Sequence, residues 1–171
     1  HDAIELAVRN VPKVAGEVVI CPDVSASMTW PVTGYRKGAS SAVRHVDVAA
    51  LVAASFMRVN RKCQVLPFEV RGRNARLNPR DTILTNAERL SALAGGGTNC
   101  SAPLRWLNDR RTAPDLVVFV SDNQSWVDAG GGRQSTAMMT EWAALKRRNP
   151  QAKLVCIDIA PYGTTQAQTR P

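Results

Sequence analysis

Three short apolar runs constrain the fold of this 171-residue chain more than any other feature of its sequence. They cover residues 18–21, 116–120 and 154–159, the last interrupted by Asp158. All three are rich in Val and Ile, and their apolar residues are nearly continuous rather than alternating with polar ones. An uninterrupted apolar run of this length is typical of a strand that is covered on both faces. The runs therefore predict the inner strands of a parallel sheet.

Helical patterns fall between these runs. One apolar stripe with offsets of three and four predicts a helix that contains Val48, Leu51, Val52, Ser55, Phe56 and Val59. The same spacing recurs over residues 138–145, and Pro103 suits the first turn of a further helix. Residues 63–70 predict another strand, and residues 75–79 an edge strand. This alternation predicts an α/β fold: a doubly wound, mostly parallel central sheet with helices on both faces, as in Rossmann-like proteins.

Composition favours one compact domain over residues 1–171, because 44% of the residues are hydrophobic and the chain is of single-domain length. Residues 1–12 are predicted to form a short lead-in helix that ends at Pro12. The chain begins with His and shows no leader peptide, so we expect it to be a piece excised from a longer protein. No apolar run reaches the roughly 18 residues of a membrane span, and no membrane partner is expected.

The formal charge of +8 favours a polyanionic partner, nucleic acid above all, although a solvated basic surface explains it equally well. Tyr35, Arg36 and Lys37, in an insertion over residues 33–41, are candidates for a weak contact with RNA phosphates, although a surface loop without a partner is the favoured interpretation. The four cysteines have no zinc-site or redox-motif spacing, which indicates free thiols in a reducing, cytoplasmic compartment. Trp106 is expected to lie in the core.

Polar side chains follow two of the predicted strands at the same end of the sheet. Asp23 lies two residues after the end of the first apolar run, and Asp122 lies two residues after the end of the second. Ligands of open parallel sheets bind beyond the carboxyl ends of the strands, so these two carboxylates are expected to converge. Thr98 lies in a glycine loop just before a predicted helix and is expected to face the same crevice.

These residues suit a hard divalent cation. Asp23, Ser25 and Ser27 alternate along one loop, so three side chains can turn toward one ion. Magnesium takes about six oxygen ligands in octahedral geometry and keeps several waters. The sequence therefore predicts a site for Mg²⁺, with Mn²⁺ or Ca²⁺ as alternatives that accept the same oxygens. Its predicted residues are Asp23, Ser25, Ser27, Thr98 and Asp122.

This pattern of D-x-S-x-S, a loop Thr and a strand-ending Asp resembles the metal-ion-dependent adhesion site of von Willebrand factor A domains. The resemblance implies that Ser25, Ser27 and Thr98 touch the ion directly. It implies that Asp23 and Asp122 act directly or through water. An acidic group of a protein partner would then complete the coordination, and no catalytic residue would be involved.

A narrower resemblance rests on "NVPKVAGEVVICPDVSASM", "GGGTNCSAPLRW" and "VFVSDNQSW". These segments are similar to the A domain of the Ro autoantigen and its bacterial orthologues, the TROVE family of RNA-binding proteins. The resemblance implies a longer protein whose ring of helical repeats binds misfolded RNA ends and small Y RNAs in RNA quality control. This chain would be the A domain that closes the ring.

An enzyme is the alternative from a different class. An Asp after the first strand also suits metal-dependent phosphoryl transfer with Asp23 as nucleophile. Haloacid-dehalogenase-type phosphatases place their nucleophile in this way but need a second acid two residues later, where this chain has Ser25. No serine lies in a G-x-S-x-G elbow, and His45 is expected to be a surface residue at a helix start rather than a general base.

Overall fold

A computed structural model of the chain describes residues 4, 6, 8–34, 41–73, 75–122 and 137–160. The elements of the described chain alternate between strands and helices along most of its length. In chain order they are η1 (Val8–Asn10), β1 (Val18–Pro22), η2 (Ala26–Thr29), α2 (His45–Val59), β2 (Cys63–Val65), α3 (Ile83–Ser91), α4 (Ala102–Asp109), β3 (Leu116–Ser121), α5 (Ala137–Arg148) and β4 (Lys153–Asp158). Within these ranges, no helix is both long and apolar enough to cross a bilayer.

The described strands form one parallel sheet in the order β2-β1-β3-β4. The register places Ile20 of β1 between Val65 of β2 and Val118 of β3, and Val118 pairs in turn with Val155 of β4. All three apolar runs of the sequence are strands of this sheet. The predicted α/β fold with a parallel central sheet is confirmed.

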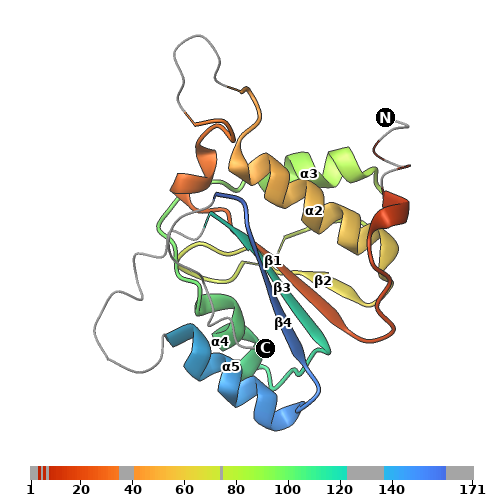
Figure 1. The fold of residues 1–171 in the computed structure, drawn as a ribbon, viewed down its shortest axis with the longest axis vertical. Helices are drawn as coiled ribbons and strands as arrows, with labels where there is room; N and C mark the ends of the chain where they lie inside the picture. Colours follow the sequence, from red (N-terminus) through yellow and green to blue (C-terminus); the bar gives the residue numbers. More distant parts are fainter. Residues whose placement is uncertain are drawn as a thin grey trace.

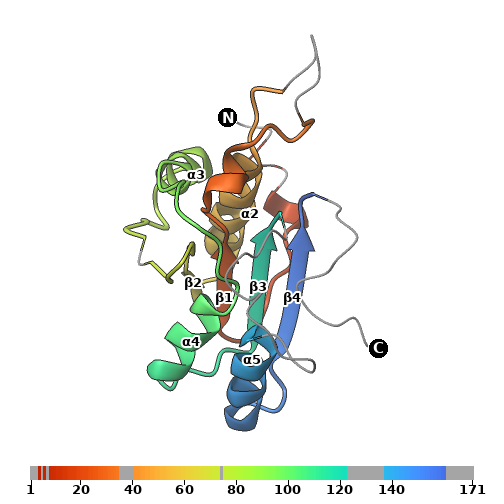
Figure 2. The ribbon, with the colours of Figure 1, turned by 90° about the vertical axis from the view of Figure 1, so that its left-hand side faces the viewer.

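Helices cover both faces of the sheet, so the core has two halves. Figure 1 shows α2 and α3 on one side of the sheet and α4 and α5 on the other, and Figure 2 shows the same arrangement turned by 90°. Alternate residues of β1 enter different halves: Ile20 packs with the α2 residues, and Cys21 packs with Leu104 of α4. In the second half, Phe68 and Phe119 meet edge to face, with ring centroids 5.5 Å apart.

Strand β4 departs from the prediction that every apolar run is covered on both faces. None of its residues is fully buried, and Val155 is 43% exposed. The physical reason is its place in the sheet: β4 pairs with β3 on one side and is the last strand of the described sheet. Apolar composition alone does not distinguish such a strand from an inner one.

Two further segments differ from the prediction. Residues 75–79 form no strand; they lead instead to Thr82, whose side chain accepts a hydrogen bond from the Thr85 backbone N–H and caps α3. Helix α3 itself was not predicted from the sequence. Strand β2 is also shorter than predicted: it ends at Val65, and Phe68 adds isolated bridges to Asp23 and to Gly72.

The start of the chain and of α2 partly match the prediction. Within the predicted lead-in helix the structure describes η1, which ends before Pro12, whereas residues 1–3, 5 and 7 lie outside the described residues. His45 begins α2 as predicted, but it is only 7% exposed, so its assignment to the surface is wrong.

All four cysteines are free thiols. Burial raises the pKa of Cys21 well above its usual value, and it raises the pKa of Cys63 to about 12. Burial, together with the nearby Asp158 charge, raises the pKa of Cys156 to about 12 as well. A thiol with a raised pKa stays protonated and is a poor nucleophile and metal ligand near neutral pH. These cysteines therefore pack as small apolar residues.

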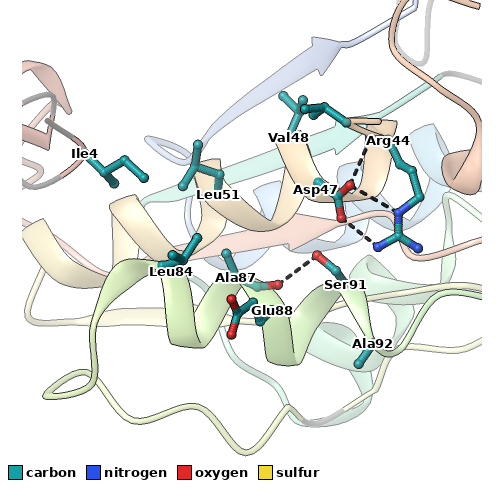
Figure 3. Close-up of a pocket in the computed structure, with 11 residues that line it drawn as sticks. Ile4, Arg44, Asp47, Val48, Leu51, Leu84, Ala87, Glu88, Ser91 and Ala92 are labelled. Carbon is teal, nitrogen blue, oxygen red and sulfur yellow. Dashed lines mark hydrogen bonds and ion pairs between the residues drawn. The ribbon is translucent and has the colours of Figure 1, made fainter. Parts of the chain in front are cut away.

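The first turn of α2 is held by Asp47. Its carboxylate accepts hydrogen bonds from the backbone N–H of Arg44 at 2.9 Å and from the Arg44 guanidinium at 2.7 and 3.1 Å (Figure 3). Burial alone would raise the pKa of Asp47, but the hydrogen bonds from Arg44 outweigh it and lower the pKa. The bonds thus stabilise the charged carboxylate at the positive end of the helix.

We expect Asp47→Asn to lower the free energy of unfolding by about 0.5–1 kcal/mol near pH 7, a small value because both partners are partly exposed. A lowered folded-state pKa gives its full stabilisation above the unfolded pKa and loses it as the pH falls through the folded pKa, so the loss caused by the substitution should fade below about pH 4. Urea unfolding near pH 7 and below pH 4 measures the difference in the free energy of unfolding between wild type and variant. Glu88→Gln is the control, since Glu88 is exposed and makes no side-chain hydrogen bond to any described residue; an equal loss there would contradict the role of Asp47.

Candidate metal site

Asp23 lies one residue beyond β1, at the carboxyl end of the sheet. Its backbone N–H donates to Val120 of β3 at 2.9 Å, so it extends the pairing of the two strands. Pro22, the last residue of β1, lacks an N–H and is tolerated because β2 ends at Val65, opposite Ile20. Strand β1 thus delivers Asp23 to the edge of the sheet where parallel α/β proteins bind ligands.

The Asp23 carboxylate is completely buried and has both of its oxygens engaged. Oδ1 accepts from the Ser25 backbone N–H at 2.8 Å, and Oδ2 accepts from the Ser121 hydroxyl at 2.6 Å. Burial raises the pKa of Asp23 to about 6, the nearby Asp122 adds to the rise, and the hydrogen bonds from Ser121 and Ser25 oppose it. The fold therefore holds a carboxylate whose charge is costly without a cation.

Ser25 and Ser27 continue from Asp23 into the 3-10 helix η2. Their hydroxyl oxygens lie 3.2 Å apart, so the predicted alternation brings both side chains together. Ser25 is buried, whereas Ser27 is partly exposed. The backbone oxygens of the two residues accept from Met28 and Trp30, which fixes the turn.

Thr98 comes from the glycine loop between α3 and α4. Two backbone hydrogen bonds tie this loop to the first one: Gly95 N–H donates to Val24 at 2.8 Å, and Ala26 N–H donates to Gly96 at 2.9 Å. Thr98 is only 1% exposed, yet its hydroxyl makes no hydrogen bond to a described residue. A nearly buried hydroxyl without a protein partner is a natural ligand for an ion or water.

Gly96 has a conformation that favours glycine. Its φ of +82° lies in the left-handed region, and a Cβ there would lie 1.8 Å from a carboxylate oxygen of Glu69. Glu69 in turn is ion-paired with Arg73, and its backbone oxygen accepts from the Asn99 N–H at 2.9 Å. The Glu69 side chain thus packs against the loop that carries Thr98.

Asp122 follows β3 and is 1% exposed. Because β1 and β3 are adjacent and parallel, with Pro22 paired to Val120, Asp23 and Asp122 lie at the same edge of the sheet. Ser121, which comes just before Asp122, was missed by the sequence reasoning although it donates to Asp23. Its position at the end of a strand beside an acidic residue was the available signal.

The chemistry of this donor set fits a hard divalent cation. The five predicted residues offer two carboxylates and three hydroxyls, and all are at least partly buried. Among the described residues, no group of three or more His, Cys, Asp or Glu side chains is placed to hold a metal ion. An ion at this edge would therefore depend on the hydroxyls of Ser25, Ser27 and Thr98, which suit Mg²⁺ better than zinc or copper. Cation binding itself stays a prediction.

Further features lie apart from this donor set or outside the described residues. Tyr35, Arg36 and Lys37 of the insertion lie outside the described residues. Trp30 ends η2 and is 51% exposed. A cavity of about 440 Å³ lies elsewhere, between α2 and α3; Leu51, Leu84 and Ala87 contribute to its lining, and none of the five candidate residues does (Figure 3).

Comparisons with known proteins agree with this fold. The Ro60 vWA domain family matches residues 17–170. The chain is 25% identical over 170 residues to the RNA-binding protein RO60 of Deinococcus radiodurans, covering 99% of this chain and 31% of that protein. The crystal structure of the Deinococcus radiodurans RO (RSR) protein superposes with a TM-score of 0.70 at 19% identity, covering 96% of this chain and 31% of that one.

The parallel sheet, its two helical layers and the superposition define a von Willebrand factor A fold. The chain belongs to the Ro60 vWA domain family, as the resemblance of its sequence motifs predicts. It spans 31% of the length of the curated relative that it matches.

Proposed function

We propose that the chain is a non-enzymatic binding module that uses a divalent cation, Mg²⁺ above others, within a Ro-like RNA-binding protein. Ser25, Ser27 and Thr98 would bind the ion directly, and Asp23 and Asp122 directly or through water. When bound, the ion supplies a positive charge with an open coordination position for an acidic group of a partner. The observation that carries the proposal is the joining of the Asp23–Ser27 and Gly95–Thr98 loops at the carboxyl end of β1.

The exposed fractions of the five candidate residues support one direction of approach for a partner. Asp23, Ser25, Thr98 and Asp122 are each at most 1% exposed, whereas Ser27 is partly exposed. A partner's carboxylate would therefore reach the cation on the side of Ser27. The four buried residues would hold the cation and keep water from competing for it.

The state of Asp23 favours binding over phosphoryl transfer. A nucleophilic carboxylate needs one oxygen that is open to the substrate, but both oxygens of Asp23 accept hydrogen bonds and the residue is 0% exposed. Residue 25, where a phosphatase of the type considered above needs its second acid, is a serine whose hydroxyl contacts that of Ser27. These contacts support a binding role for Asp23 over nucleophilic attack.

The relative supports a place for the module in RNA metabolism. That protein is named an RNA-binding protein, and this chain corresponds to about a third of it. By the family resemblance, the whole protein would bind Y RNA and misfolded RNA through a ring of helical repeats in the cytoplasm. The module would serve RNA quality control by recruiting a protein partner to that ribonucleoprotein.

The proposal is tested by adding a carboxylate to the isotopically labelled protein and following its amide NMR signals. Acetate should shift signals of residues 23–27 and 95–98 only when Mg²⁺ is present. Thr98→Ala should abolish the acetate effect. Thr29→Ala is the control, because among the described residues the Thr29 hydroxyl bonds only to the Ala26 oxygen, at 2.7 Å, and the effect should persist. Acetate shifts that are independent of Mg²⁺ would contradict the proposal.

A further inference from the structure

A second recess lies against α4 and the loop that follows Phe68. Its volume is about 270 Å³, and its lining includes Arg71, Gly72, Asn99, Arg105, Trp106 and Asp109. This volume lies just below the roughly 300–1,000 Å³ of sites for drug-sized ligands, so it suits a single small planar group. Asn99 directly follows Thr98, so one loop borders both the recess and the candidate metal site.

Trp106 provides an aromatic surface in this recess. The sequence predicts that Trp106 lies in the core, but its side chain is only partly buried against the core residues and also lines the recess. The Arg110 guanidinium lies 3.8 Å from the centroid of its ring, an ordered cation–π contact. Gly72 lines the recess next to the indole; a Cβ there would make ordinary contacts of 3.5 Å with Cβ and Cδ1 of Trp106.

Charged and polar groups surround the aromatic ring. Arg71 is exposed and makes no ion pair with a described residue, and Arg105 is 61% exposed with a single contact of 3.3 Å to Glu141. Asp109 is exposed and accepts no hydrogen bond from a described residue. The Asn99 side-chain oxygen is occupied by Ser101, whereas its NH₂ group makes only a 3.5 Å contact with Val70, which leaves donor capacity.

We propose that this recess, here called the Trp106 pocket, binds one nucleotide of single-stranded RNA. The base would stack in the pocket on Trp106, and Arg71 and Arg105 would contact the flanking phosphates. Asn99 and Asp109 would offer a donor and an acceptor to the base edge, and a carboxylate suits the amino group of cytosine. Aromatic stacking between cationic side chains is the common chemistry of single-strand recognition.

The choice of RNA over an acidic peptide follows from these groups. A peptide carboxylate would form ion pairs with Arg71 and Arg105 alone, and Asp109 would repel it. A nucleotide base can contact the Trp106 ring, the Asp109 acceptor and the Asn99 donor together. The net charge of +8 favours either polyanion and does not decide between them. The proposal rests on the proposed place of the chain in an RNA-binding protein, but it does not require a bound cation.

The test is fluorescence anisotropy of a labelled oligocytidine of about ten nucleotides, in the presence of a chelator and at about 50 mM salt. Arg71→Glu and Arg105→Glu should each weaken binding about 10-fold or more, and Trp106→Leu roughly 5- to 100-fold. Trp106→Phe should keep most of the affinity, because a ring remains to stack. Arg80→Glu is the matched control: Arg80 is exposed, lies outside the pocket and undergoes the same charge change, so its loss should stay within about 3-fold.

Three results would overturn the proposal. Equal losses in the Arg71, Arg105 and Arg80 variants would assign the binding to diffuse charge. An oligoglutamate that competes as well as the RNA would assign the pocket to acidic peptides. A wild-type protein that does not bind the oligocytidine would remove the site altogether. Because the measurement is made without divalent cations, each of these results leaves the metal proposal standing, and failure of Mg²⁺ binding leaves this one standing.

Discussion

Asp23→Asn is expected to abolish stabilisation by Mg²⁺ while leaving the metal-free protein at least as stable as the wild type at about pH 7.5. The reason is the burial of the Asp23 carboxylate, which raises its pKa from 3.8 to about 6. Between these values the unfolded chain releases its proton first, so the metal-free wild type loses stability as the pH rises from about 4 to about 6. An uncharged amide of the same shape avoids that loss, which is at most about 3 kcal/mol.

Urea unfolding with chelator and with excess Mg²⁺ measures both effects. A free Mg²⁺ concentration about 100 times Kd should raise the free energy of unfolding of the wild type by about 2.7 kcal/mol. The variant should show no rise. In the chelator its stability should equal or exceed that of the wild type near pH 7.5, and the two proteins should converge toward pH 4. A variant that is much less stable without metal would assign Asp23 a purely structural role.

Gly96→Ala is expected to disturb the loop that carries Thr98. The substitution places a side chain at a φ of +82° and within 1.8 Å of a Glu69 oxygen. The left-handed conformation costs about 1 kcal/mol for a residue other than glycine, and displacing a half-buried, ion-paired carboxylate adds to it. We therefore expect the free energy of unfolding to fall by about 1–3 kcal/mol. Mg²⁺ affinity should fall about 10-fold or more, because Thr98 lies two residues away.

Gly97→Ala is the matched control in the same loop. The φ of Gly97 is not in the left-handed region, and its nearest neighbour would be a Val70 methyl carbon at 3.4 Å, an ordinary contact. Its stability should change by no more than about 0.5 kcal/mol, and its Mg²⁺ affinity should be retained. Unfolding and calorimetric titration of both variants provide the comparison. Equal effects of the two substitutions would show that the contact between Gly96 and Glu69 does not position the loop.

The parallel sheet could be predicted because its strands are nearly uninterrupted apolar runs. Strand β4 shows the limit of that reasoning. Its apolar run resembles that of β1, but Val155 is 43% exposed because β4 is the last strand of the described sheet, and position in the sheet is not encoded in composition. Helix α3 was missed for a related reason. It buries only Ile83, Asn86, Ala87 and Leu90, and the polar and charged residues between them mask its short stripe.

Much of the candidate site could be anticipated from topology. Asp23 and Asp122 follow strands that proved to be adjacent and parallel, so they share an edge of the sheet. The contacts that position the site could not be read in this way. The bond from Ser121 to Asp23 and the packing of Glu69 on Gly96 link residues 98 and 27 positions apart, and no spacing rule relates such pairs.

The most direct test of the metal-dependent account is calorimetric titration of the metal-free protein with Mg²⁺ and Mn²⁺, beside Asp23→Ala. The account predicts saturable binding with a stoichiometry of about one ion per chain, lost in the variant, since the proposed donor set forms one site and Asp23 is one of its two carboxylates. Absence of saturable binding in the wild type, or binding that the substitution leaves unchanged, would contradict it.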